Sequence, residues 1–147
     1  MRQKGKTQMR GPVYKTPYAA AVLAATVALS GSIFADSKTE TRLRTQLTGS
    51  AIGGVTPSGN ADFRSDSRGR TRLNVEVEHV NLPQGTTLTV TITHAGASTT
   101  AGSILLNALG FGELELNSQD GAAVPAVQSG DVVTVMNGAS AVLAGVF

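Results

Sequence analysis

The chain has 147 residues, of which 41% are hydrophobic and 4% aromatic, and it contains no cysteine. This composition fits one modest domain with an aliphatic core, and it excludes disulfides and thiolate chemistry. The formal net charge is +2, but five of the twelve Lys and Arg lie ahead of residue 19, namely Arg2, Lys4, Lys6, Arg10 and Lys15. A nucleic-acid-binding role needs basic side chains clustered on one face with aromatics between them, and this distribution argues against it.

Residues 1–35 have the three parts of a secretory signal peptide. A basic region precedes an apolar run from Ala19 to Leu29, and small residues lead on to Ala35. That run is too short for a membrane-spanning helix, which needs about 20 residues. We therefore predict cleavage after Ala35 and a secreted protein, periplasmic or extracellular, that meets the membrane only during export. There are two alternatives: cleavage a few residues earlier, and retention of residues 1–35 as a membrane anchor.

Removal of residues 1–35 changes the sign of the charge. The remaining 112 residues (147 minus 35) carry seven Lys and Arg against ten Asp and Glu, which gives a formal charge of −3. All seven basic residues precede Leu73. We therefore expect a mildly acidic mature protein without a nucleic-acid partner.

The mature chain begins with a polar segment, residues 36–45, which lacks a sustained apolar face and predicts a flexible lead-in. From residue 46 to 147, short β-prone runs alternate with Gly, Pro, Asn, Asp and Ser. This pattern predicts a single all-β domain, an antiparallel Greek-key β-sandwich of about eight strands. The strands are expected near residues 46–52, 60–64, 70–79, 87–94, 102–106, 112–116, 132–136 and 141–147.

The stretch from Leu73 to His94 contains two strict alternations of apolar and polar residues. The connection between them holds Pro83 and Gly85, which suit a chain reversal, and the whole stretch predicts a β-hairpin. The side chains expected to face the core are Leu73, Val75, Val77, Leu88, Val90 and Ile92. The acidic side chains expected to share one exposed sheet face are Glu76, Glu78, Glu113 and Glu115.

The two histidines, His79 and His94, continue the inward register of their runs. Pairing as a hairpin would place them about 20 Å apart, so one metal ion could not bridge them, and each is expected to cap the end of a core strand. The chain has no Cys nucleophile and no G-x-S-x-G elbow. The paired glutamates are expected to face solvent, where nothing raises their pKa. We therefore predict no catalytic, metal or cofactor site.

Four arginines cluster around one turn: Arg64, Arg68, Arg70 and Arg72. They are candidates for surface recognition of an acidic polysaccharide or a lipid head group. The alternative is a turn that is simply solvated.

Several short motifs occur in a characteristic order along the mature chain. They are Leu47-Thr48-Gly49, Pro57 to Phe63, Leu73 to Val77, Val80 to Pro83, Ser129 to Asp131 and Leu143 to Phe147. In this order the chain resembles the CHRD family, named after chordin and also found in secreted bacterial proteins. The resemblance implies a secreted Greek-key β-sandwich without known enzymatic chemistry. The family's usual H-x-H is represented by His94 alone, and the later strand that often carries a histidine has none, so the family's metal ligands do not carry over.

These observations predict an exported, non-enzymatic structural or ligand-binding module of the cell envelope or extracellular space. Its partner would be an envelope polysaccharide or another protein. The alternatives are a subunit of an extracellular fibre that assembles by strand exchange, and a carbohydrate- or metal-binding domain.

Overall fold

The computed structural model describes residues 39–147. Eight strands follow one another: β1 (Glu40–Thr48), β2 (Ser58–Asp66), β3 (Thr71–Glu78), β4 (Thr87–His94), β5 (Ala97–Leu105), β6 (Gly112–Asn117), β7 (Val132–Asn137) and β8 (Ser140–Val146). One 3-10 turn, η1 (Ser118–Asp120), follows β6. No helix within the described residues has the length and apolar character needed to cross a membrane.

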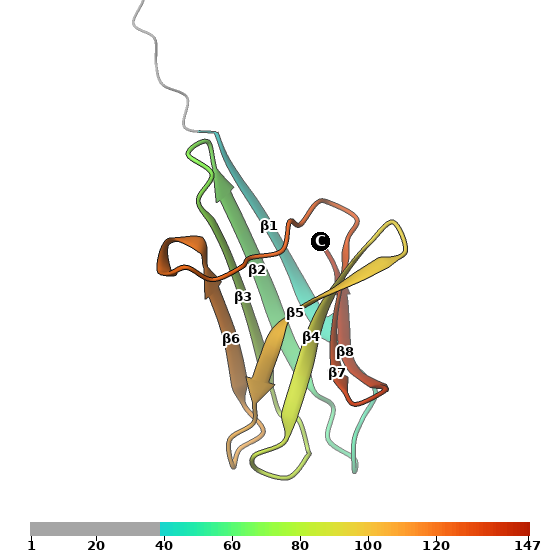
Figure 1. Cartoon of the computed structure of the whole chain (residues 1–147). Helices are drawn as coiled ribbons and strands as arrows, with labels where there is room; N and C mark the ends of the chain where they lie inside the picture. Colours follow the sequence, from blue (N-terminus) through green and yellow to red (C-terminus); the bar gives the residue numbers. More distant parts are fainter. Residues whose placement is uncertain (1–38) are drawn as a thin grey trace, which may run out of the picture. The chain divides into compact units, whose positions relative to one another are not determined.

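All eight strands belong to one sheet with the order β5-β4-β7-β8-β1-β2-β3-β6 (Figure 1). Neighbouring strands are antiparallel, and β8 joins β1 through a single register pair, Thr48 with Ala144. The two edge strands approach each other closely, since a Cβ on Gly102 of β5 would lie 2.9 Å from Leu114 of β6. The predicted all-β class with eight antiparallel strands is confirmed. The strands form one nearly closed sheet, and the Greek-key sandwich arrangement that we predicted is not confirmed.

The core lies inside the curved sheet and confirms the alternation predicted for β3 and β4. Leu73, Val75 and Val77 are at most 1% exposed. The three inward residues of β4 are at most 3% exposed. Burial of each such aliphatic side chain contributes about 1.5 to 3 kcal/mol. The other large side chains buried with them are Leu47, Phe63, Val80, Ile104, Leu106, Val127, Val133, Val135, Val142 and Leu143.

The predicted hairpin between β3 and β4 is wrong. Strand β3 pairs with β2 and β6, while β4 pairs with β5 and β7. The β3–β4 connection instead bonds to the β5–β6 connection. Val80 N–H donates to the Gly110 carbonyl at 3.0 Å, and Leu106 N–H donates to the Thr86 carbonyl at 2.9 Å. The two connections therefore form adjacent arches, and each arch leads from one half of the sheet to the other.

His79 does not continue the inward register of β3, contrary to the prediction. Its φ is +57°, which turns the chain out of the strand, and its exposed ring packs against Phe111 at a centroid distance of 5.2 Å. Val80 takes the buried position instead, with 1% exposure. The arch needs this change of direction because the chain must leave the β3 half of the sheet.

The flexible lead-in predicted over residues 36–45 is wrong from Glu40 onward, because β1 begins there. Strand β1 is paired with β2 along its whole length. Leu43 packs against the core opposite Phe63, while Arg42 and Arg44 point outward. The alternation of inward and outward positions is enough to place this segment in the sheet, even though most of its residues are polar. The signal peptide predicted for residues 1–35 lies outside the described residues, and so do residues 36–38.

Candidate functional site

All charged side chains within the strands lie on one half of the sheet. Strands β4, β5, β7 and β8 contain no Asp, Glu, Lys or Arg. The outward positions of β1, β2, β3 and β6 carry the charges in rows that cross the strands. The first row is Arg42, Arg64, Arg72 and Asn117; the second is Arg44, Asp62, Asn74 and Glu115; the third is Gln46, Asn60, Glu76 and Glu113. The shared exposed face predicted for the glutamates is thus present, and it is basic at one end and acidic at the other.

Three guanidinium groups converge on the carboxylate of Asp62. Arg42 donates through Nε at 3.0 Å and through Nη2 at 2.8 Å, and Arg64 donates through Nε at 2.9 Å. Arg44 donates through Nε to the same carboxylate. One negative charge therefore holds three positive charges, which leaves two positive charges uncompensated within the cluster. We call Arg42, Arg44 and Arg64 the arginine triad.

The position of Asp62 keeps it ionised. Partial burial raises the pKa of Asp62, but hydrogen bonds and charge from Arg44 and Arg64 outweigh this effect and hold the pKa below its ordinary value. Its side chain is 17% exposed, whereas that of Arg44 is 65% exposed. The carboxylate is therefore a fixed support beneath guanidiniums that solvent and ligands can reach.

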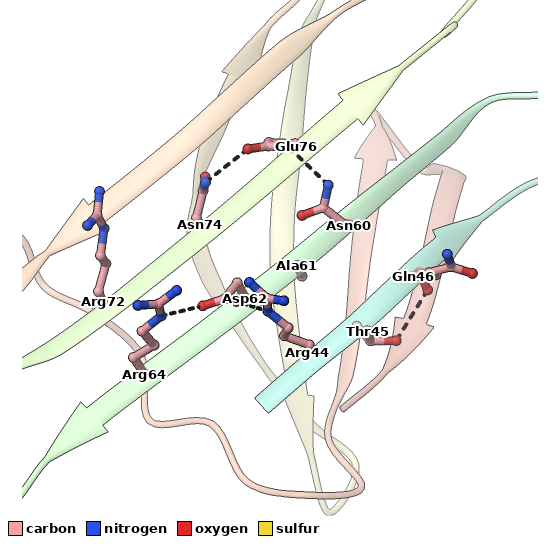
Figure 2. Close-up of a pocket in the computed structure, with 10 residues that line it drawn as sticks. All are labelled: Arg44, Thr45, Gln46, Asn60, Ala61, Asp62, Arg64, Arg72, Asn74 and Glu76. Atoms are coloured by element: carbon pink, nitrogen blue, oxygen red, sulfur yellow. Dashed lines mark hydrogen bonds and ion pairs between the residues drawn. The ribbon is translucent and has the colours of Figure 1, made fainter. Parts of the chain in front are cut away.

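A groove of about 620 Å³ runs along this face (Figure 2). Its lining consists of Arg44, Thr45, Gln46, Asn60, Ala61, Asp62, Arg64, Arg72, Asn74 and Glu76. A second groove of about 290 Å³ lies beyond it toward the β2–β3 turn, and Arg64 and Arg72 line both. The volume of the first groove lies within the range of small-molecule sites in proteins.

The end of the first groove away from the triad is rich in hydrogen-bond acceptors. Glu76 accepts from the amide nitrogen of Asn60 at 2.9 Å and from that of Asn74 at 3.1 Å. Both amide nitrogens are therefore turned toward Glu76, as Figure 2 shows. The Asn74 Oδ1 atom is buried without a hydrogen-bond partner. A buried acceptor without a donor is uncommon in folded proteins.

The structure separates the four arginines that we predicted as recognition residues. Arg64 and Arg72 line both grooves, Arg70 lines only the second, and Arg68 lines neither. Arg72 is paired with Glu115, and Arg70 with Asp66. The hydrogen bonds from Arg70 hold the pKa of Asp66 below its ordinary value.

Sequence reasoning missed Arg42 and Arg44, because the segment that holds them was predicted to be a flexible lead-in. It also missed Asp62 as their common partner. The alternation of Arg42, Leu43 and Arg44 was the signal that could have placed both arginines on the outward face of a strand.

His94 takes part in a pair that the sequence did not predict. Its Nδ1 lies 2.5 Å from Oδ1 of Asp131, whose side chain is only 3% exposed. The other oxygen of Asp131 accepts from the Gln128 N–H at 2.8 Å. Burial raises the pKa of Asp131, but these hydrogen bonds outweigh it and place the pKa below its ordinary value. No group of three or more potential metal ligands occurs among the described residues.

The Asp131 pair makes stability depend on pH. Because the pKa of Asp131 is lowered in the folded state, its stabilising contribution is present above pH of about 4 and is lost as the pH falls through the folded-state pKa. Asp131→Asn is expected to cost about 1 to 2 kcal/mol at pH 7 and progressively less as the pH falls below about 4. Urea unfolding over a series of pH values from 7 downward measures this, and a loss that stays constant through the acid range would contradict it.

No protein-family model, curated protein or solved structure matched this chain.

Proposed function

We propose that this protein is an exported, non-enzymatic binding module whose arginine-bearing sheet face binds an acidic polysaccharide. The observation that carries the proposal is the arginine triad on Asp62. Each guanidinium has five N–H donors, and only one or two from each are used on Asp62. The remaining donors and the two uncompensated charges suit the carboxylate or sulfate groups of such a polymer.

The arrangement of the basic row favours a polymer over a single small anion. Arg42, Arg64 and Arg72 occupy register-matched positions on three adjacent strands. At about 4.8 Å between strands, their Cα atoms span about 10 Å. A chain with repeated negative charges can contact all three at once, whereas a single anion contacts one or two. Export and the CHRD-like character belong to the same proposal, and they rest on residues 1–35 and on the short motifs along the chain.

Strand exchange in a fibre is the less favoured function. Residues 40–48 already form strand β1 within their own sheet, and they are paired with β2 at nine register positions. Donation of this strand to a neighbouring molecule would first have to break that pairing.

Calorimetric titration of the full chain with polygalacturonate tests the proposal. Arg64→Gln is expected to weaken binding about tenfold, which equals about 1.4 kcal/mol, and added salt is expected to weaken binding further. Arg68→Gln is the matched control, because it removes the same charge from a residue that lines neither groove. Equal losses in the two variants would contradict the proposed site. Binding to anionic vesicles without binding to the polymer would assign the face to a lipid surface.

A further inference from the structure

The first groove contains two chemically different halves. The triad half offers guanidinium donors and positive charge from Arg44 and Arg64, while Arg42 holds Asp62 from outside the groove lining. The other half offers acceptors: the carboxylate of Glu76 and the amide oxygen of Asn60. A ligand that fills the whole groove must therefore present an anionic group at one end and hydrogen-bond donors at the other.

The acceptor half is held in this orientation by the protein itself. Asn60 and Asn74 both use their NH₂ groups on Glu76, so their amide oxygens face away from it. For Asn60 this arrangement is visible in Figure 2. The exposed amide oxygen of Asn60 is therefore left for a donor from a ligand, whereas Oδ1 of Asn74 is buried and out of a ligand's reach. Sugar hydroxyl groups are donors of the required kind.

The same half discriminates against dense polyanions. Glu76 carries a negative charge within the groove, and Glu113 occupies the next position in its row. A polymer whose charges are closely spaced and that has no hydroxyl groups would bring one anion to Arg44 and Arg64 and the next toward Glu76. Repulsion between like charges disfavours that arrangement.

We infer that the unit bound in this groove is a uronic acid residue, with its carboxylate on Arg44 and Arg64 and its hydroxyl groups on Asn60 and Glu76. The inference rests on the proposed function and adds the chemical class of the bound sugar. A uronic acid satisfies both halves of the groove because it carries a carboxylate and several hydroxyl groups on one ring.

The test compares two probes, oligogalacturonate and polyphosphate with the same number of charges, by calorimetry on the full chain. The wild-type protein is expected to bind oligogalacturonate at least tenfold more tightly. Glu76→Gln is expected to reduce this preference at least threefold, because it removes the negative charge that repels polyphosphate and replaces one of the two oxygens that orient the asparagines with an NH₂ donor. Glu78→Gln is the matched control, since it makes the same change on the same strand outside the groove lining.

The outcomes separate the inference from the function on which it rests. Equal affinities for the two probes, or a preference that Glu76→Gln and Glu78→Gln reduce equally, would overturn the uronic acid assignment and leave polyanion binding intact. Failure of both probes to bind would overturn the proposed function, and the assignment would fall with it.

Discussion

A chain that begins at Gln46 is expected to lose at least about 3 kcal/mol of its free energy of unfolding relative to a chain that begins at Thr39. The shorter chain lacks the part of β1 that pairs with β2 from Glu40 to Thr45. It also lacks Leu43, which packs against the core at the position opposite Phe63. Because Phe63 is only 3% exposed, removal of its neighbour uncovers a large apolar side chain.

Urea unfolding followed by far-ultraviolet circular dichroism measures the difference. The chain that begins at Thr39 is the control, because it retains all of β1. Equal unfolding midpoints would mean that residues 40–45 are the dispensable lead-in that their polar composition predicts.

Gly110→Ala is expected to destabilise the fold by about 2 to 4 kcal/mol. Gly110 has a φ of +73°, and an added Cβ would lie 2.4 Å from the Val80 carbonyl oxygen and 2.9 Å from its nitrogen. The substitution therefore combines an unfavourable backbone conformation with a clash between the two arches, and neither contacting atom is a flexible side chain.

Gly85→Ala is the matched control for this prediction. Gly85 also lies in an arch and has a φ of +83°, but nothing lies within 4 Å of an added Cβ there. Gly85→Ala therefore has only the cost of a positive φ in a residue with a Cβ. The difference between the two variants in thermal unfolding then measures the contribution of the close approach between the arches. If Gly110→Ala is no more destabilising than Gly85→Ala, the arches do not hold each other in place.

The sequence predicted which side chains are buried more successfully than which strands are neighbours. Alternation requires only that one face of a strand meets the core, and Val75 and Val90 satisfy this condition equally in a hairpin or in an arch. What distinguishes the arch from the hairpin is a set of backbone hydrogen bonds between segments distant in the chain, such as the bond from Val80 N–H to the Gly110 carbonyl. The turn residues Pro83 and Gly85 reverse the chain direction in either arrangement.

The candidate site was only partly predictable for a similar reason. The local run of arginines identified Arg64 and Arg72, which do line the groove. The triad, however, joins Arg42 to Asp62 across twenty residues of chain, and only strand register brings them together. In the sequence, Asn74 and Glu76 look like ordinary outward residues of a strand. The hydrogen bond between them depends on side-chain orientations that the sequence pattern does not reveal.

We propose that the triad end of the sheet face is an anion-binding site. Titration of the full ¹⁵N-labelled chain with oligogalacturonate, followed by NMR, tests it most directly. We expect the largest shifts at the Nε–H signals of Arg42, Arg44 and Arg64, with little change along β4 and β7, which carry no Asp, Glu, Lys or Arg. Shifts spread evenly over both halves of the sheet, or none at the triad, would contradict it.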